Sequence, residues 1–140
     1  MKLNPDCIRA VMLELEKSWD MDTDDRGNLF MGEITLDQLC SSLPKFDKKD
    51  IFYSLYNLEQ AGYLDLSILW ADGGIAYYCS VNHMTYAGHE FLESIRDSKH
   101  WAAVKNGMSA VRNYSLAAIS SIAEGVANAA IAAYVKDLGL

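Results

Sequence analysis

Residues 85–101 read TYAGHEFLESIRDSKHW, and this stretch predicts an amphipathic helix around which the rest of the chain is arranged. Thr85 is a suitable N-cap, because its hydroxyl can accept a hydrogen bond from a free N–H in the first helical turn. The apolar residues recur at helical spacing, so we expect them to share one buried face. That face consists of Gly88, Phe91, Leu92 and Ile95, and the charged face consists of Glu90, Glu93, Arg96 and Asp97.

A pair of strands is predicted immediately before this helix. Residues 63–70 (YLDLSILW) and 75–81 (IAYYCSV) are rich in the residue types that favour β-strands. Residues 71–74 (ADGG) supply the turn between them, because glycine adopts positive φ without a steric cost. Two strands joined by so short a turn predict an antiparallel hairpin.

Two helices are predicted before the hairpin. Thr35 is the expected N-cap of a short helix over residues 36–43. Asp47 is the expected N-cap of a longer helix, which ends at Gly62 because glycine favours the position just after a helix. The inward face of the longer helix consists of Ile51, Leu55 and Leu58.

The N-terminal part of the chain predicts a helix, an acidic loop and a short strand. Asn4 and Pro5 are suited to begin a helix, which we expect to end near Trp19. Residues 20–27 (DMDTDDRG) are acidic and aperiodic, which indicates a solvated loop. Residues 29–35 are predicted to form a short strand.

The predicted order is therefore helix, short strand, two helices, hairpin and helix. This order is typical of a winged helix-turn-helix, a mainly α fold with a small β-hairpin. Residues 1–108 are assigned to the winged-helix domain. Residues 109–140 form a C-terminal helical extension, in which Ser115 is the expected N-cap of an alanine-rich helix over residues 116–136. We interpret this extension as an oligomerisation element.

Composition and charge narrow the classes of function. The 140 residues are 51% hydrophobic, which suits one globular domain with a core. The 12 basic and 19 acidic side chains give a formal net charge of −7, and an acidic chain repels nucleic acid unless its cations are gathered on one face. Three widely spaced cysteines and an N-terminus without an apolar run predict a cytoplasmic protein with reduced thiols.

Several short segments resemble known winged-helix proteins. Residues 58–64 (LEQAGYL) and 84–88 (MTYAG) resemble the segments that flank the wing in many winged-helix regulators. A second set of segments is spread along nearly the whole chain. These segments are Asn4-Pro5-Asp6, Gly88-His89-Glu90-Phe91-Leu92, Ile95-Arg96-Asp97, Trp101 and the helix that begins at Ser115-Leu116. Together they are similar to a family of small uncharacterised winged-helix proteins from phages and prophages. The resemblance implies a winged-helix fold and a phage or prophage origin, and it implies no catalytic residues.

The outward face of the helix over residues 47–61 is the candidate binding surface. In a winged helix-turn-helix this helix enters the major groove of DNA, where Asn57 and Gln60 could read adenine and lysines could contact phosphates. However, residues 45–61 have no net charge, and the wing carries Asp72 and no lysine or arginine. We therefore favour a protein partner, with a DNA-binding transcriptional regulator as the alternative. The candidate face consists of Lys45, Lys48, Lys49, Tyr53, Tyr56, Asn57 and Gln60.

No residue pattern predicts a catalytic, cofactor or metal site. The histidines and cysteines do not form a nucleophile, base and orienting group at recognisable spacing. Gly73-Gly74 lacks the ending of a phosphate-binding loop. The aspartates from Asp20 onward lack the glutamate that closes a calcium loop, because Met31 stands at the twelfth position. We therefore expect a non-enzymatic protein without a cofactor or a small-molecule substrate.

The alanine-rich helix permits three arrangements. It is about long enough to cross a bilayer, but it contains Glu124 and Asn128, and alanine contributes little to membrane insertion. It could pack only on its own domain, although its apolar residues are spread around the helix. We favour a homodimer, because pairing of two copies would cover the remaining apolar surface. The expected interface consists of Ile119, Ile122, Val126 and Ala130.

Overall fold

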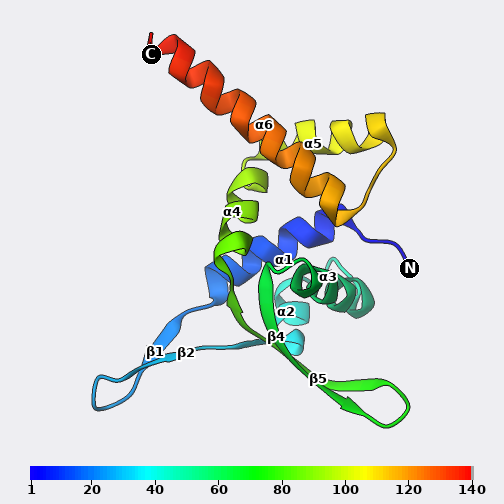
Figure 1. The fold of residues 1–140 in the computed structure, drawn as a ribbon. Coiled ribbons are helices and arrows are strands. Elements are labelled where there is room, and N and C mark those ends of the chain that lie inside the picture. The colour runs from blue at the N-terminus through cyan, green and yellow to red at the C-terminus, as the bar shows by residue number, and fades with distance from the viewer. Residues whose placement is uncertain (140) are drawn as a thin grey trace.

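The computed structural model describes residues 1–139 and shows a winged helix-turn-helix with a long C-terminal helix (Figure 1). Most of the chain is helical, and the predicted order of elements is confirmed outside residues 20–35 and 85–101; the strand predicted over residues 29–35 is two strands, which belong to different sheets. The helices are α1 (Pro5–Ser18), α2 (Leu36–Ser42), α3 (Lys48–Gln60), α4 (Tyr86–Ile95), α5 (Ser98–Val111) and α6 (Leu116–Asp137). The strands are β1 (Met21–Thr23), β2 (Leu29–Met31), β3 (Ile34–Thr35), β4 (Leu64–Ala71) and β5 (Ile75–Met84).

The predicted hairpin is confirmed as the wing. β4 and β5 pair antiparallel, and β3 adds to the other side of β5, which gives a three-stranded sheet in the order β3-β5-β4. Gly73 and Gly74 both have positive φ, 80° and 76°, so the turn uses the backbone freedom of glycine. The returning strand is longer than predicted and continues to Met84, next to the N-cap of α4.

The predicted helix starts are confirmed, and four of the five predicted N-cap residues accept a side-chain hydrogen bond: Asn4, Thr35, Thr85 and Ser115, whereas Asp47 stands at the N-cap of α3 without one. Asn4 accepts a hydrogen bond from the backbone N–H of Cys7 at 3.2 Å. Thr35 and Gln38 form a reciprocal capping box at the start of α2. Ser115 accepts from the N–H of Ala118 at 3.1 Å. These bonds satisfy donors that the first turn of a helix leaves without a partner.

The prediction of a single helix over residues 85–101 is wrong, because the chain forms two helices there. Thr85 caps α4 as predicted, but α4 ends at Ile95, and Asp97 caps a new helix by accepting from the N–H groups of Lys99 and His100. The guanidinium of Arg9, in α1, donates to the carbonyl oxygens of Ile95 and Arg96. A side chain that is distant in the sequence therefore donates hydrogen bonds to the carbonyl groups at the end of α4. The local sequence pattern does not reveal this contact.

The prediction of a solvated loop over residues 20–27 is confirmed for residues 24–27 but is wrong for Met21–Thr23, which form a strand. β1 and β2 pair antiparallel in the register Met21↔Met31, Asp22↔Phe30 and Thr23↔Leu29. The carboxylate of Asp24 accepts from the N–H groups of Arg26 and Asn28 and closes the tip. The acidic residues thus build the turn of a hairpin, which projects from the body of the protein (Figure 1).

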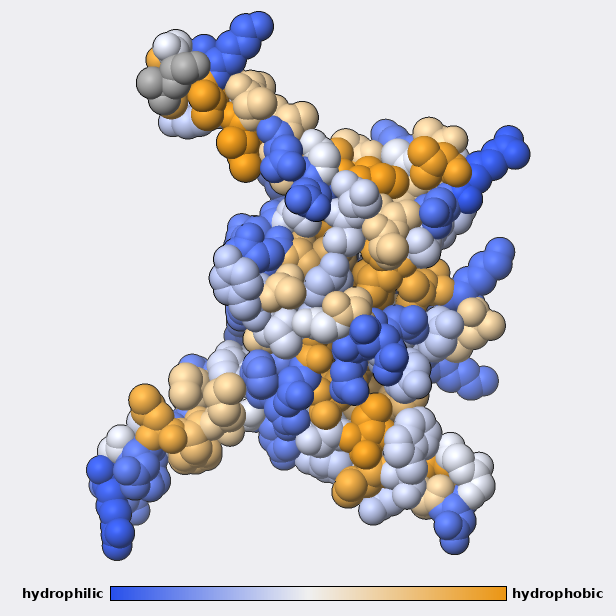
Figure 2. Space-filling model, viewed as in Figure 1, coloured by the Kyte–Doolittle hydropathy of each residue, from blue (hydrophilic) through white to orange (hydrophobic). Residues whose placement is uncertain are grey.

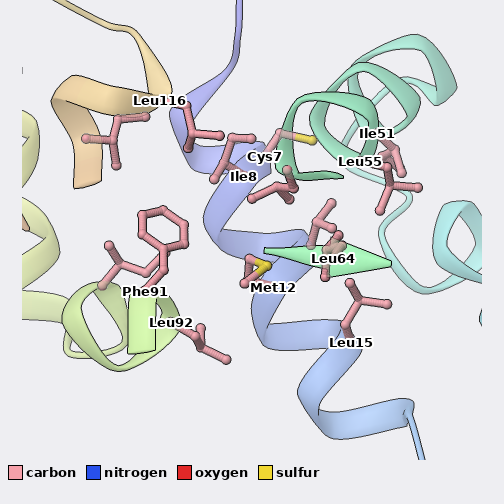
Figure 3. Packing of buried hydrophobic residues seen from close by; sticks show 14 of the residues in the cluster. Cys7, Ile8, Met12, Leu15, Ile51, Leu55, Leu64, Phe91, Leu92 and Leu116 are labelled. Carbon is pink, nitrogen blue, oxygen red and sulfur yellow. The ribbon is translucent and has the colours of Figure 1, made fainter. Parts of the chain in front are cut away.

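One hydrophobic core joins all six helices to the wing. Figure 3 shows Ile8 and Met12 of α1 between Leu55 of α3 and Leu92 of α4. The predicted burial of Phe91, Leu92 and Ile95 is confirmed. The last residue of the predicted extension, Leu140, lies outside the described residues. The core also contains three residues of the first half of α6, so this half packs as part of the winged-helix domain. The three residues are Leu116, Ile119 and Ala123.

Two glycines allow close approach between elements. A Cβ on Gly107 of α5 would lie 2.8 Å from Cγ2 of Ile122 of α6, so the glycine that weakens α5 locally is what lets α6 pack against it. A Cβ on Gly88 of α4 would lie 2.1 Å from the carbonyl oxygen of Tyr63. That same carbonyl accepts from the N–H of Thr85, which fixes the start of α4 against the start of β4.

We expect Gly88→Ala to destabilise the protein by about 1–3 kcal/mol, because the added methyl group forces backbone apart at this junction. Gly125→Ala is the matched control, since Gly125 also lies within a helix but a Cβ there meets nothing within 4 Å. The control should stabilise the protein by up to about 1 kcal/mol through helix propensity. Urea unfolding of the two variants measures both effects, and equal shifts of the same sign would contradict the close contact.

Candidate interaction surfaces

The structure places the predicted α3 residues on the side of the helix that faces away from the core. Lys48, Lys49, Tyr56 and Gln60 are exposed, and so is Lys45 just before the helix. Tyr53 and Asn57 are half-buried, because they flank the inward stripe. The helical period alone was sufficient to predict this arrangement.

Two of these side chains already have partners within the chain. The ammonium of Lys48 lies 3.3 Å from the carboxylate of Asp37, an exposed ion pair of the kind that contributes little stability. The amide of Asn57 donates to the carbonyl oxygen of Tyr53 at 2.8 Å. A base or a phosphate would have to replace these contacts before either side chain could read DNA.

An aromatic cluster extends the α3 face onto the wing, and sequence reasoning missed it. Phe52 stacks on Tyr56, with ring centroids 6.5 Å apart, and meets the edge of Trp70 of β4 at 6.2 Å. The side chain of Trp70 is exposed by 54%. We call Phe52, Tyr56 and Trp70 the α3–wing surface. The available signal in the sequence was a tryptophan, Trp70, directly before the turn of the wing at residues 71–74.

The α3–wing surface lies in an acidic part of the chain. From Lys45 to Met84 there are three lysines, no arginine and five acidic side chains. All three lysines stand at or before the first turn of α3, so the wing has no cation. The acidic side chains are Asp47, Asp50, Glu59, Asp65 and Asp72.

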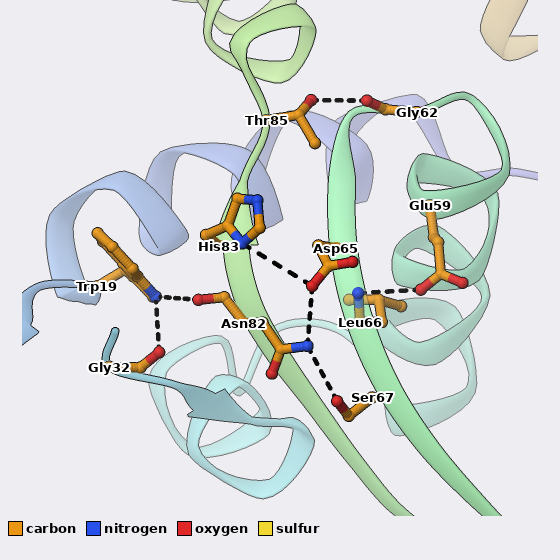
Figure 4. Close-up of polar contacts among 10 residues, drawn as sticks. All are labelled: Trp19, Gly32, Glu59, Gly62, Asp65, Leu66, Ser67, Asn82, His83 and Thr85. Atoms are coloured by element: carbon orange, nitrogen blue, oxygen red, sulfur yellow. Dashed lines mark hydrogen bonds and ion pairs between the residues drawn. The ribbon is translucent and has the colours of Figure 1, made fainter. Parts of the chain in front are cut away.

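The polar contacts at the base of the wing hold the sheet together (Figure 4). The amide of Asn82 in β5 donates to Asp65 and Ser67 of β4 at 3.0 and 2.9 Å. The carboxylate of Glu59 at the end of α3 accepts from the N–H of Leu66 at 3.0 Å. These bonds fix the wing relative to α3 and so fix the aromatic cluster that spans them.

The thiols and imidazoles are not arranged for nucleophilic chemistry. Burial raises the pKa of Cys79 to about 11, and burial also raises the pKa values of Cys7 and Cys40, so all three thiols are protonated at neutral pH. The imidazole of His83 lies 3.8 Å from the carboxylate of Asp65, and Cys79 is not its partner. Within residues 1–139, no three His, Cys, Asp or Glu side chains are grouped as metal ligands.

The second half of α6 leaves the body of the protein. A groove of about 830 Å³ runs between α4 and α6, with Phe91, Ala127, Ile131 and Tyr134 among its walls. Beyond Ala130 every described residue of α6 is exposed, and Ile131 and Tyr134 expose 61% and 65% of their surface. Figure 2 shows hydrophobic residues along this projecting end.

The predicted dimer residues lie closer to the domain than expected. Ile119 is fully buried by its own chain, so it is not available to a second copy, and this part of the prediction is corrected. Ile122 and Val126 are half-buried against the same core, and Ala130 is half-buried at its edge. Over the first half of α6, the side predicted to face a second copy therefore packs against α4 and α5.

α6 also has the length and composition of a membrane span. Its mean hydropathy reaches 1.5 over a stretch of which only 11% is buried. However, the part of α6 in which every residue is exposed, from Ile131 to Asp137, has seven residues and is about 10 Å long, whereas the hydrocarbon core of a bilayer is about 30 Å thick. Crossing a bilayer would require Leu116, Ile119 and Ala123 to leave the core.

The fold and these surfaces define a winged-helix protein with an added C-terminal helix. The chain belongs to the family described as Hypothetical protein (DUF2513), whose model matches residues 2–114 and so ends before α6. An uncharacterised protein of Haemophilus influenzae is 28% identical over 134 residues, which cover 90% of this chain and 95% of that protein.

A crystal structure of Streptococcus pneumoniae FabT in complex with DNA is also similar. It aligns over 95% of this chain and 76% of the FabT chain, at 18% identity and a TM-score of 0.38. The winged-helix assignment itself follows from the strand pairing and the helix order of this chain.

Proposed function

We propose that this protein is a non-enzymatic interaction protein and that its α3–wing surface binds another protein. The aromatic cluster of Phe52, Tyr56 and Trp70, in which Tyr56 and Trp70 are exposed, carries this proposal. Tyrosine and tryptophan are enriched at protein interfaces, where they bury a large apolar area and often contribute most of the affinity. The acidic surroundings suit a partner with a basic or neutral surface better than they suit a phosphate backbone.

DNA binding is the second candidate function. The three lysines around the start of α3 favour it, because all three are exposed at the beginning of the helix that winged-helix proteins insert into the major groove. Gln60 is exposed on the same side and could contact adenine. Against this candidate stand the five acidic side chains of the region and a wing without lysine or arginine.

A titration of mixed-sequence duplex DNA over salt concentration separates the two candidates. Even specific DNA-binding proteins retain an electrostatic mode, whose affinity falls by about 0.9 log units per log unit of salt for each phosphate neutralised. We expect no measurable binding at low salt. Binding with a steep salt slope, which the triple replacement Lys45→Ala, Lys48→Ala and Lys49→Ala flattens, would establish the DNA-binding alternative instead.

The protein partner is tested by affinity capture from a host lysate with mass spectrometry. We expect a protein that the intact chain retains and that Trp70→Glu loses. Tyr114→Glu is the matched control, because Tyr114 is an aromatic residue of similar exposure outside the α3–wing surface. Equal loss with both variants, or equal retention by all three chains, would remove the α3–wing surface as the binding site.

We also propose that two copies associate through the free half of α6. The exposed Ile131 and Tyr134 lie beside the α4–α6 groove, and a second copy would cover this apolar surface without a further gene product. A cytoplasmic location and a phage or prophage origin complete the proposal. The short free length of α6 supports the first, and the resemblance of residues 4–116 supports the second.

A further inference from the structure

The groove between α4 and α6 has the dimensions of a binding site for a helix. α6 lines it from Ser120 to Tyr134, which corresponds to about 21 Å and about four helical turns. The volume of about 830 Å³ lies in the upper part of the range for ligand pockets, which is about 300–1,000 Å³. Figure 1 shows α6 running past α4 and then beyond the body of the protein. A groove between two helices can hold a third helix, which is a common mode of protein recognition.

The floor of the groove is apolar and is fixed by contacts within the chain. Tyr63 and Phe91 line it, and their rings stack with centroids 4.6 Å apart. The hydroxyl of Tyr63 lies 2.9 Å from the hydroxyl of Ser120, which also lines the groove. Tyr63 therefore connects α4 to α6, so the floor is in place before a partner binds.

The α6 wall of the groove has the spacing of a helix-packing seam. Ser120, Glu124, Ala127, Ile131 and Tyr134 all line the groove, and they follow one another in alternating steps of four and three residues. An average step of 3.5 residues places side chains along one side of a helix, where they can interdigitate with those of a neighbouring helix. The small side chains of Ser120 and Ala127 allow close approach, and the outer end of the seam is exposed.

The charges on the walls favour a cationic partner. Glu90 and Glu93 of α4 and Glu124 of α6 line the groove, whose walls contain no lysine or arginine and one histidine, His100. Arg96 compensates Glu93, because its guanidinium lies 2.8 Å from that carboxylate. Glu90 and Glu124 are exposed, and within residues 1–139 neither forms an ion pair. Each wall therefore carries one uncompensated carboxylate, which selects a partner with positive charge on both sides of its apolar stripe.

We propose that the α4–α6 groove binds a basic amphipathic helix of a partner protein. The apolar stripe of that helix lies on Phe91, Ala127 and Ile131, and its lysine or arginine side chains meet Glu90 and Glu124. The groove is thus a second site for a protein partner, separate from the α3–wing surface. A second copy that covers the free half of α6 would occupy the outer end of the same groove, so it competes with this helix.

A synthetic amphipathic peptide of 14 residues tests the site by fluorescence anisotropy. The probe carries leucine at heptad positions a and d and lysine at positions e and g, which flank the leucine stripe. We expect the intact chain to bind it. A peptide with glutamate in place of lysine, and a peptide of the same composition whose order scatters the leucines around the helix, should each bind at least about tenfold more weakly.

Two pairs of carboxylates separate the groove from the general acidity of the chain. The double variant Glu90→Gln and Glu124→Gln should weaken binding of the lysine peptide about fivefold, as expected for the loss of two exposed ion pairs. The double variant Asp22→Asn and Asp25→Asn is the matched control, because it removes the same charge from two exposed residues of the β1–β2 hairpin. The control should leave the affinity unchanged.

Two alanines of α6 test the shape of the groove. Ala127→Trp fills the groove, which Ala127 lines, and should weaken binding of the lysine peptide about tenfold or more. Ala129→Trp is the matched control, because Ala129 is exposed and lies roughly 200° further around the helix. The control should bind as the intact chain does. Circular dichroism melting of both variants confirms that the fold is kept.

Light scattering accompanies each titration and separates this proposal from the proposed self-association. No peptide binding by a chain whose mass is 15.6 kDa would overturn the proposal, and so would equal affinities within any of the matched pairs of peptides or variants. A single copy that binds the peptide contradicts only the self-association. A dimer that does not bind the peptide after dilution to single copies contradicts only this inference. Trp70→Glu should leave peptide binding unchanged, because Trp70 belongs to the α3–wing surface.

Discussion

Phe91→Ala is expected to reduce the free energy of unfolding by about 3–5 kcal/mol, the sum of lost apolar burial and of a cavity that the surroundings fill only partly. Phe91 exposes only 4% of its surface and stacks on Tyr63, with ring centroids 4.6 Å apart and planes within 7°. The hydroxyl of Tyr63 in turn lies 2.9 Å from the hydroxyl of Ser120 in α6. The ring therefore supports the contact between the winged-helix domain and α6.

Equilibrium urea unfolding followed by circular dichroism measures this loss as a lower midpoint with an unchanged slope. Phe30→Ala is the control, because the same side chain is removed from an exposed position on the β1–β2 hairpin. The control should change stability by less than about 0.5 kcal/mol. A loss below about 1 kcal/mol for Phe91→Ala would mean that α4 does not pack as described.

The second large effect is expected on the molar mass of the protein in solution. If two copies associate through the free half of α6, light scattering will give twice the chain mass of 15.6 kDa. Ile131→Glu should return the mass to that of one chain, because a carboxylate would replace an apolar side chain in the contact and lose its hydration there. The effect is a twofold change in mass, without a change in helical content.

Ala129→Glu is the matched control for this variant. It adds the same charge to the same exposed part of α6, but two residues away and so roughly 200° around the helix. The control should remain a dimer. An intact chain that stays at 15.6 kDa over a wide concentration range would refute self-association, and the apolar end of α6 would then require a different partner.

The helix starts and the wing turn could be predicted because their causes are local. Asn4, Thr35 and Ser115 accept hydrogen bonds from N–H groups three residues further on, so a few residues contain the whole interaction. Gly73 and Gly74 set the turn through their own φ angles. The exposed side of α3 followed from the helical period, which places Ile51, Leu55 and Leu58 inside.

The break between α4 and α5 and the β1–β2 hairpin could not be predicted in this way. The side chain of Arg9 donates a hydrogen bond to the carbonyl oxygen of Ile95 at the end of α4, and these two residues are 86 positions apart in the chain. The hairpin is tied to the body by Trp19, whose indole N–H donates to the carbonyl oxygens of Gly32 and of Asn82, 63 residues away. Such bonds depend on which distant backbone groups remain unpaired, and periodicity within a segment contains no information about that.

The candidate surfaces also combine features that the sequence determined with features that only the tertiary structure decided. The amino-acid sequence determined the winged-helix order, the acidic charge and the outward residues of α3, because caps, turns and periodic burial are properties of neighbouring residues. The tertiary structure decided that Phe52 meets Trp70, that α4 and α6 form a groove, and that Ile119 packs on its own domain. These contacts depend on the angles between elements, and those angles are set by how large side chains fill one common core.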